Sequence, residues 1–270
     1  MRPSRGRRSR HGVAVAESLS GAVTGGRRLA GTVLTLPGAT AAELLAEPFD
    51  LVWVDLEHGA LGPLDAQEMI IGAQAAGTYA LVRLPSDAHR LMAAMLDAGA
   101  DGVVLADVAH PQTAIAAIER VAHPPDGTRG WGPRRLTLRQ RGTGRRPPRP
   151  SVWVQIESAQ GVAHAEQIAA VPGVDAVVVG TADLSFSLGA PLDTHAPELL
   201  HAVETVRRAA HGAGVALGVA GALDAVAPAA YAGASILVHS TDARLCAGAV
   251  DDAAAWLRGV LDPDRGIAVT

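Results

Sequence analysis

Two acidic residues of this 270-residue chain each follow an apolar run of the β type. Glu157 ends the run 151–157, and Asp183 comes just after the run 176–181, so the two carboxylates are 26 residues apart. If both runs are strands of one parallel barrel, their carboxyl ends open onto the same face. Two carboxylates completed by water form a hard oxygen site suited to Mg²⁺, Mn²⁺ or a similar divalent ion.

The basic residues give a second, independent argument for a metal, because all 23 are arginines and the chain has no lysine. A Schiff base on lysine is a common way to activate a carbonyl substrate without a metal. A carboxylate-held ion is the natural replacement. It could chelate a 2-oxo acid through the keto oxygen and one carboxylate oxygen, and stabilise the enolate formed when a C3 proton or the C3–C4 bond is lost.

Other polar residues stand at the ends of neighbouring apolar runs. Arg83 could neutralise a substrate carboxylate, for which a planar guanidinium suits better than an ammonium. His58 could transfer a proton, because imidazole changes its charge near neutral pH. Backbone N–H groups around Ala182 and Asp183 could bind a carboxylate oxygen. Each residue also has a simpler role, such as a surface ion pair, a turn or a helix cap. Their convergence on one face favours the functional interpretation.

The elements that position these residues are read from hydrophobic periodicity. Eight short apolar runs alternate with Ala- and Leu-rich helical stretches, and such runs are typical of a sheet buried on both faces. The runs are 31–36, 51–57, 79–85, 102–107, 151–157, 176–181, 216–221 and 235–240. The helical stretches are 41–47, 65–76, 87–98, 111–121, 161–170, 198–211, 224–231 and 242–261. Eight β/α units predict a TIM (β/α)8 barrel, with a doubly wound open sheet as the alternative.

Composition sets wider bounds on the chain. It is 49% hydrophobic with only 3% aromatic residues, so one barrel core must be built from Ala, Val, Leu and Ile. The single cysteine, Cys246, excludes an intrachain disulfide and favours a cytoplasmic location. No apolar stretch approaches the roughly 20 residues of a membrane span.

Two segments rich in arginine differ from the rest of the chain. Residues 1–28 carry seven arginines and one glutamate, and we expect a disordered tail before a barrel domain at 29–270. The barrel domain then has 16 arginines against 26 acidic residues, which argues against nucleic acid as a partner. The Arg/Pro-rich stretch 137–150 is expected to be a mobile loop that orders over the site.

Seven short motifs, in this order and spacing, span about residues 30–240. They are FDLVWVDLEHG (49–59), VRLP (82–85), LDAGA (96–100), PPDGTRG (124–130), QIES (155–158), VPGVD (171–175) and GTADLS (180–185). With these motifs the chain resembles the HpcH/HpaI family of class II, metal-dependent pyruvate aldolases, of the 4-hydroxy-2-oxoheptanedioate and 2-dehydro-3-deoxy-sugar-acid aldolase type. Two positions depart from the family pattern: Thr181 stands where proline is usual, and Val33 where an aromatic residue is common.

The resemblance implies a role for each candidate residue. Glu157 and Asp183 would hold the metal, which would be Mg²⁺, Mn²⁺ or Co²⁺, and no organic cofactor would be needed. Arg83 would bind the pyruvyl carboxylate, and Gln155 would contact the substrate near the metal.

The resemblance also implies how protons move and how the chain assembles. His58 would be the acid/base residue, paired with Asp97, which in such oligomers can come from a neighbouring subunit. The expected assembly is a homohexamer built as a trimer of dimers, often with the last helix, here 242–261, exchanged between subunits.

The expected activity is that of a divalent-metal-dependent aldehyde-lyase. It would cleave or form the C3–C4 bond of a 4-hydroxy-2-oxo acid through a metal-bound pyruvate enolate, with pyruvate or another 2-oxo acid and an aldehyde as partners. One alternative on the same scaffold is an oxaloacetate decarboxylase whose enolate is captured in specialised biosynthesis. A coenzyme A ester lyase and a non-catalytic barrel with a partner-binding arm are further alternatives.

Overall fold

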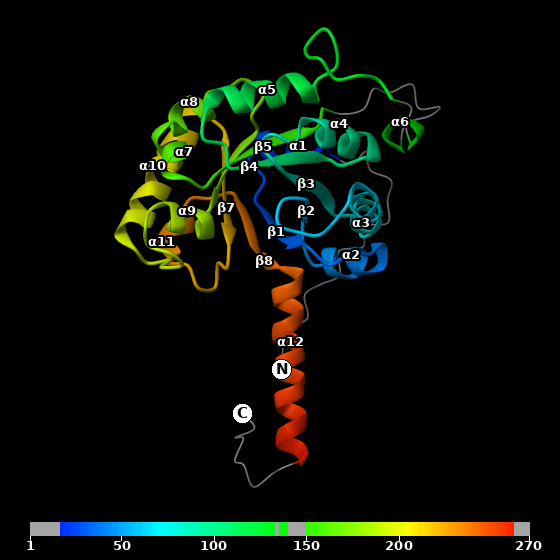
Figure 1. Cartoon of the computed structure of the whole chain (residues 1–270), viewed down its shortest axis with the longest axis vertical. Coiled ribbons are helices and arrows are strands. Elements are labelled where there is room, and N and C mark those ends of the chain that lie inside the picture. The colour runs from blue at the N-terminus through cyan, green and yellow to red at the C-terminus, as the bar shows by residue number, and fades with distance from the viewer. Residues whose placement is uncertain (1–16, 133–134, 140–148, 262–270) are drawn as a thin grey trace.

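The computed structural model describes residues 17–132, 135–139 and 149–261. Eight parallel strands form a closed barrel in chain order, each hydrogen-bonded to the next and β8 to β1. Helices surround the strands, and the last helix projects away from the barrel (Figure 1). The predicted TIM barrel is confirmed, and the open doubly wound sheet is wrong because the first and last strands pair.

The strands are short and lie close to the predicted runs, with ends that differ by no more than two residues. They are β1 (Leu29–Leu34), β2 (Leu51–Asp55), β3 (Tyr79–Pro85), β4 (Gly102–Ala106), β5 (Ser151–Ile156), β6 (Ala176–Gly180), β7 (Ala216–Gly221) and β8 (Ile236–Thr241).

Most of the helices lie in the connections between the strands. The helices are α1 (Leu19–Thr24), α2 (Ala39–Ala46), α3 (Pro63–Ala75), α4 (His89–Ala98), α5 (Pro111–Val121), α6 (Arg135–Arg139), α7 (Ala159–Ala163), α8 (Ala165–Ala169), α9 (Thr181–Ser187), α10 (Pro197–Ala213), α11 (Pro228–Tyr231) and α12 (Asp242–Leu261). Helices α2 to α11 are in these connections, whereas α1 precedes β1 and α12 follows β8. The predicted helix 161–170 is interrupted at His164 into α7 and α8. Within the described residues, no helix is long and apolar enough to cross a membrane.

Alternation along the strands separates two buried layers. Leu51 and Trp53 of β2 belong to the cluster inside the barrel, whereas Val52 and Val54 pack outward against the helices. Trp53 also meets Trp153 of β5 edge to face, with ring centroids 6.1 Å apart. Side chains alternate along a strand, so the second residue after each tryptophan also points into the barrel. These residues, Asp55 and Gln155, lie one layer closer to the carboxyl ends of the strands.

The predicted disordered tail is wrong in its last part, because α1 is an ordered helix. Leu19 and Val23 of α1 are buried and belong to the cluster inside the barrel. Ser20 Oγ donates a hydrogen bond to Asp175, which precedes β6. The helix therefore covers the N-terminal opening of the barrel, where apolar side chains outweigh the local excess of arginine. Residues 1–16 lie outside the described residues.

Most of the Arg/Pro-rich stretch 137–150, which we expected to order over the site, lies outside the described residues, and only its two ends are described. Just before it, Arg135 Nη1 donates to Gln74 Oε1 at the end of α3 (2.9 Å). Near its end, Arg149 Nη1 donates to the Gly173 carbonyl before β6 (3.0 Å). Both contacts lie at the N-terminal face, because this segment joins a helix to the following strand. Its middle lies outside the described residues, so its mobility stays a prediction.

The packing of α1 predicts a stability effect at a position that the sequence assigns to a tail. Leu19→Ala should lower the free energy of unfolding by about 2–5 kcal/mol, because it leaves a cavity against the barrel interior. Urea denaturation measures this loss. Leu44→Ala, at a residue that is 73% exposed, is the control and should change the stability little. Equal stabilities of the Leu19→Ala variant and the unsubstituted protein would show that α1 does not contribute to the fold.

Candidate active site

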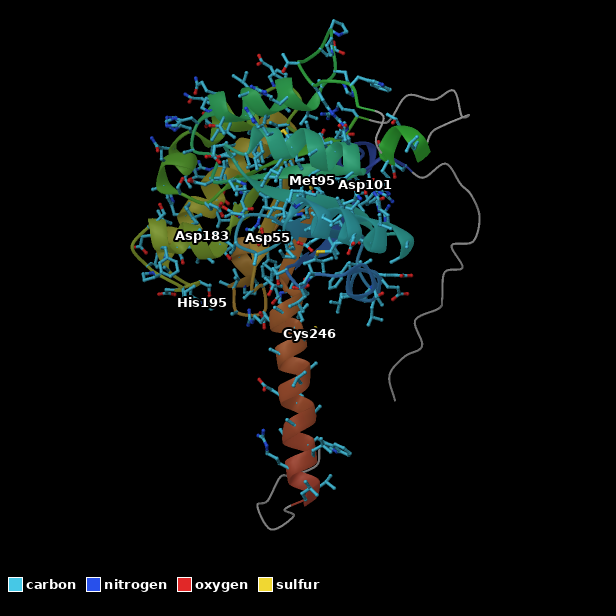
Figure 2. The ribbon with its side chains drawn as sticks, turned by 45° about the vertical axis from the view of Figure 1, so that its right-hand side comes forward. Asp55, Met95, Asp101, Asp183, His195 and Cys246 are labelled. Atoms are coloured by element: carbon cyan, nitrogen blue, oxygen red, sulfur yellow. The ribbon has the colours of Figure 1, made fainter. Side chains whose placement is uncertain are left out.

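An arginine–aspartate pair connects two neighbouring strands at their carboxyl ends. Asp55 of β2 and Arg83 of β3 are direct partners in the strand register. Arg83 Nε donates to Asp55 Oδ1 (2.9 Å) and Nη2 to Asp55 Oδ2 (2.7 Å), so the contact is bidentate. Figure 2 shows Asp55 and Asp183 on the side of the barrel from which α12 leaves, away from Asp101 before β4. The pair therefore lies at the face where TIM barrels carry their active sites.

This pair keeps both partners charged although Asp55 is buried and the side chain of Arg83 is only 11% exposed. Burial alone would raise the pKa of Asp55, but the hydrogen bonds and the charge of Arg83 outweigh it and hold the pKa below its usual value. Burial would lower the pKa of Arg83, and Asp55 and Glu57 raise it instead. In the described part of the chain no acceptor is bonded to Arg83 Nη1. The guanidinium is thus fixed on one edge and can bind an anion with the other.

Glu157 lies directly after β5 and is 5% exposed. One carboxylate oxygen, Oε1, accepts a hydrogen bond from the backbone N–H of Asp107 (2.7 Å), and the other accepts from Gln155 Nε2. Burial, together with the charges of Glu57 and Asp183, raises the pKa of Glu157 to about 7, although the hydrogen bonds from the Asp107 N–H and from Gln155 lower it. A cation beside Glu157 would remove this cost of ionisation.

Asp183 and Glu57 complete a cluster of three carboxylates with Glu157. Asp183 is in the first turn of α9, which begins directly after β6. Burial raises the pKa of Glu57, and the negative charge of Asp183 also raises it. The charges of Arg83 and His58 act in the opposite direction and lower this pKa. Glu57 Oε2 is 3.3 Å from Arg83 Nε, but among the described residues it accepts no hydrogen bond.

The donor set fits a divalent metal ion. Glu157 and Asp183 offer carboxylate oxygens, and the buried atoms Glu57 Oε2 and Gln155 Oε1 have no hydrogen-bond partner in the described structure. No group of three or more His, Cys, Asp and Glu side chains is arranged to hold a metal by itself in the parts of the chain that are described. Two protein carboxylates with water and substrate oxygens in the other positions are therefore the composition that fits.

Glycine at the end of β6 makes room for these side chains. A Cβ on Gly180 would lie 2.4 Å from Glu157 Oε2 and 2.6 Å from Gln155 Nε2. Its backbone conformation, with φ of −86°, is open to other residues. The requirement for glycine is therefore one of space beside the carboxylate and not of backbone geometry.

The structure places His58 at the site and Asp97 elsewhere in the same chain. His58 follows β2, its side chain is 61% exposed, and its Nε2 is 3.7 Å from Glu57 Oε2. Asp97 is in the last turn of α4, at the N-terminal face, where it forms an ion pair with Arg129 (2.5 Å). One chain therefore does not bring the two together, and their pairing across subunits stays a prediction.

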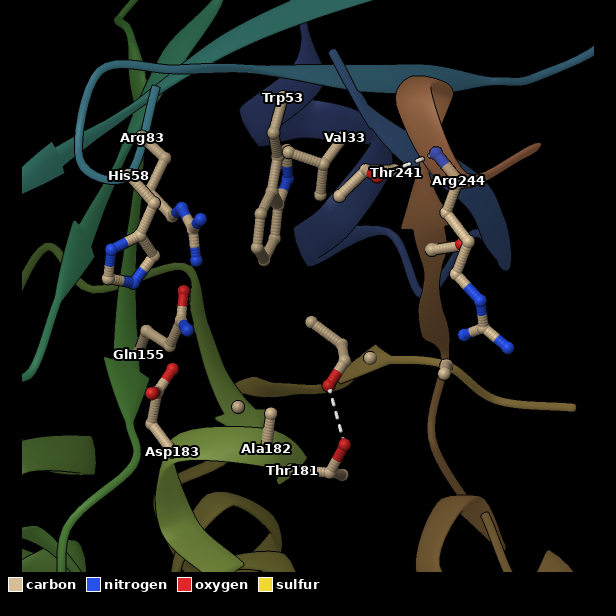
Figure 3. A pocket seen from close by; sticks show the side chains of 15 residues that line it. Val33, Trp53, His58, Arg83, Gln155, Thr181, Ala182, Asp183, Thr241 and Arg244 are labelled. Carbon is tan, nitrogen blue, oxygen red and sulfur yellow. Dashed lines mark hydrogen bonds between the residues drawn. The ribbon is translucent and has the colours of Figure 1, made fainter. Parts of the chain in front are cut away.

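A cavity of about 260 Å³ opens between these groups. Figure 3 shows Arg83, His58, Gln155 and Asp183 on one side of it and Arg244 on the other. Apolar and small residues line the space between, and they are Val33, Trp53, Gly180, Ala182, Ala220, Gly221 and Ala222. All the predicted site residues except Glu157 and Asp97 line this cavity, and Glu157 contacts Gln155, which does line it.

Sequence reasoning missed three charged residues of this region. Asp55 and Glu57 stand in the motif around His58, and the alternation of β2 could have marked Asp55 as pointing inward. Neither had an assigned role, because strand register is not visible in one sequence. Arg244 lies in the first turn of α12, where the Ala-rich composition suggested only a packing helix.

Comparisons with known proteins point to one family. A family model described as HpcH/HpaI aldolase/citrate lyase matches residues 33–249. A hydroxypyruvate/pyruvate aldolase of Rhizorhabdus wittichii is 36% identical over 199 residues, which cover 69% of this chain and 76% of the relative. A 4-hydroxy-2-oxovalerate aldolase of Rhodococcus jostii is 34% identical over 214 residues, 75% of this chain and 80% of the relative.

A solved structure has the same fold along most of the chain. It is an HpcH/HpaI aldolase/citrate lyase family protein from Burkholderia cenocepacia, with a TM-score of 0.82 and 32% identity over 90% of this chain and 100% of that one. Because the family model covers well over half of the chain, these likenesses extend across the barrel and both carboxylate motifs. The chain belongs to the HpcH/HpaI aldolase/citrate lyase family.

Proposed function

We propose that the protein is a divalent-metal-dependent aldolase that cleaves or forms the C3–C4 bond of a 4-hydroxy-2-oxo acid. The products of cleavage are pyruvate, or a related 2-oxo acid, and an aldehyde. The observation that carries this proposal is the arrangement of Arg83, fixed on one edge by Asp55, beside the buried carboxylate of Glu157. The guanidinium of Arg83 matches the carboxylate of a 2-oxo acid, and a metal site at the Glu157 carboxylate matches the neighbouring keto oxygen.

Substrate binding follows from the free hydrogen-bonding groups. The unpaired edge of Arg83 binds the C1 carboxylate, because a guanidinium matches two carboxylate oxygens. Gln155 lies between this position and Glu157, and its amide orients the head group. A divalent ion at Glu157 and Asp183 would supply Lewis-acid stabilisation of the negative charge that develops on the keto oxygen.

Bond cleavage needs a base at C4. His58 lines the cavity beside Arg83 and is open to water, so it can take the C4 hydroxyl proton and exchange it. The electrons of that O–H bond form the aldehyde C=O. The electrons of the C3–C4 bond form the C2–C3 double bond, and the π electrons of the C2 keto group move onto its oxygen, which gives the enolate of pyruvate. Proton return to C3 completes pyruvate. Glu57, with Oε2 3.7 Å from His58 Nε2, stabilises the imidazolium during this cycle.

The alternatives lose support from the comparisons. The curated relatives described above are both named as aldolases, so neither oxaloacetate decarboxylation nor a non-catalytic barrel is favoured. Mg²⁺, Mn²⁺ and Co²⁺ are the proposed metals, because only oxygen donors are present at Glu157 and Asp183.

We also propose that the protein assembles as a homohexamer in which subunits exchange α12. The support for this proposal is the apolar surface of that helix. Its outer part exposes large apolar side chains, among them Val250 (65%), Trp256 (64%) and Leu257 (52%). Apolar side chains in such numbers on a projecting helix are typical of a surface that is covered in an oligomer. Such an assembly is also what a contact between His58 and Asp97 of another subunit requires.

Removal of either predicted metal ligand should abolish metal-dependent turnover. Glu157→Gln and Asp183→Asn each take one negative charge from the site, so the affinity for Mg²⁺ should fall about 10- to 100-fold or more. Calorimetric titration with Mg²⁺ and the release of pyruvate measure both effects. Glu204→Gln, in an exposed ion pair on α10, is the control. Full activity of the Glu157→Gln variant in EDTA would rule out the metal assignment.

A single methyl group at β6 should weaken the same site without a change of charge. Gly180→Ala places its Cβ against Glu157 and Gln155, so these side chains must move and Mg²⁺ should bind less tightly. Gly218→Ala on β7 is a matched control, since the three atoms nearest to its Cβ belong to the side chains of Val178 and Ile236. Thermal unfolding of both variants separates stability from binding. If they lose Mg²⁺ affinity equally, the space at Gly180 is not specific to the site.

The bidentate contact predicts that lysine cannot replace Arg83. Arg83→Lys keeps the charge but cannot bind Asp55 through two atoms and a substrate through a third. We expect kcat/KM to fall about 10- to 100-fold, the equivalent of one or two charged hydrogen bonds. Arg27→Lys changes an Arg–Asp pair at the other face and is the control. Unchanged kinetics of the Arg83→Lys variant would contradict the clamp.

A further inference from the structure

A second arginine lines the cavity on the side opposite Arg83. Arg244 comes from the first turn of α12, and Figure 3 shows it across the cavity from Arg83 and Gln155. The steps of the proposed aldol reaction do not use it. Its position therefore needs a separate explanation.

Stability does not explain an arginine at this point of α12. The N-terminus of a helix carries a partial positive charge, so a cation in the first turn is unfavourable by a few tenths of a kcal/mol or more. The compensating ion pair, Arg244 Nη2 with Asp224 Oδ2, is 3.5 Å long. Its side chains are 53% and 60% exposed, and ion pairs of this kind contribute little.

The barrel nevertheless holds the backbone of Arg244 in place. Asp242, 1% exposed, accepts hydrogen bonds from the backbone of Thr35 (2.8 Å) and Leu36 (3.0 Å) after β1. The Arg244 N–H donates to Thr241 Oγ1 (3.2 Å). The first turn is thus anchored, and the N–H groups there are already used. The guanidinium is the group that remains for a ligand.

Charge along the cavity is uneven. The four carboxylates of Asp55, Glu57, Glu157 and Asp183 all gather at the Arg83 end, where a head group and a cation belong. Val33 and Trp53 line the region between the two arginines. The acidic partner of Arg244 is Asp224, whose side chain is 60% exposed and does not line the cavity. A ligand that spans the cavity would meet a cation, a short apolar stretch and a second cation.

We propose that Arg244 is a specificity-determining residue that binds a carboxylate at the distal end of the substrate. This rests on the proposed function, because it assigns that carboxylate to the aldehyde half of the 4-hydroxy-2-oxo acid. The substrate is then a dianion, with its C1 carboxylate at Arg83. One guanidinium suits a singly charged planar carboxylate, which it can bind through two hydrogen bonds. On binding, the carboxylate replaces Asp224 as the partner of Arg244.

The test measures binding by calorimetry in the presence of Mg²⁺. The ligands are two matched pairs of linear 2-oxo acids, 2-oxoadipate with 2-oxohexanoate and 2-oxopimelate with 2-oxoheptanoate. Each pair has one chain length, and one member has a terminal carboxylate. The unsubstituted protein should prefer the dicarboxylate of at least one pair by about 10-fold or more. Asp224→Asn removes the competing acid and should increase this preference.

Variants of Arg244 decide the assignment. Arg244→Met keeps much of the apolar stem and should abolish the preference, and Arg244→Lys should restore part of it. Arg208→Met removes an exposed arginine of α10, also in a surface ion pair, and should keep the full preference. If the Arg244→Met variant keeps the preference, or the unsubstituted protein has none in either pair, the inference is wrong.

A separate readout distinguishes this inference from the proposed function. Exchange of the C3 protons of pyruvate with deuterium, followed by NMR in the presence of Mg²⁺, reports enolate formation and needs no aldehyde. If the C3 protons of pyruvate exchange, but the preference for the dicarboxylate does not depend on Arg244, the inference is overturned and the aldolase proposal is not. A preference that depends on Arg244 without any exchange would overturn the aldolase proposal and keep the distal carboxylate site.

Discussion

The bidentate contact between Asp55 and Arg83 is the interaction on which the rest of the site depends. Both side chains are nearly buried, and a buried charge is costly unless its partner and its hydrogen bonds are in place. The register of β2 and β3 puts the two residues side by side, so the pair forms as soon as the two strands are paired. Its cation also lies near Glu57 and lowers the cost of ionising a second acid in the same layer.

The remaining acids are held by the barrel itself. Glu157 accepts hydrogen bonds from the backbone of Asp107 after β4 and from Gln155 on its own strand. Asp183 is positioned by the start of α9. The protein thus brings together more negative charge than Arg83 can balance. A cluster with this excess of negative charge is suited to bind a cation from solution, because the cation supplies the positive charge that the protein side chains lack.

Much of the fold could be predicted from the sequence, because buried parallel strands are short apolar runs and helices separate them. The positions of Glu157, Asp183 and Arg83 followed from the same pattern, since each stands at the end of a run. What could not be predicted depends on contacts between distant segments. The pairing of Asp55 with Arg83 requires the strand register, and the placement of Arg244 requires the direction in which α12 leaves the barrel.

The prediction for the N-terminal segment was wrong for a physical reason, and the prediction for the Arg/Pro-rich stretch is constrained only at its ends. The segment at Leu19 was assigned to a tail because arginines dominate the local composition, although a few apolar residues are enough to cover the open end of a barrel. The Arg/Pro-rich stretch 137–150 was expected to order over the site, and this stays a prediction because its middle lies outside the described residues. Topology places the two ends of this stretch, because a connection from a helix to a strand begins and ends at the N-terminal face, whatever its composition.

The separation of the two barrel faces has a practical consequence for protein engineering. Arg135 and Arg149 anchor the long connection between α5 and β5 at the face away from Glu157. Lengthening such a connection costs little, since the entropy of loop closure grows by only about 0.6 kcal/mol for each doubling in length. A reporter domain or an affinity peptide inserted between these anchors would be attached to the barrel at the N-terminal face, opposite the cavity. The chain therefore offers a permissive attachment point that leaves the entrance to the barrel free.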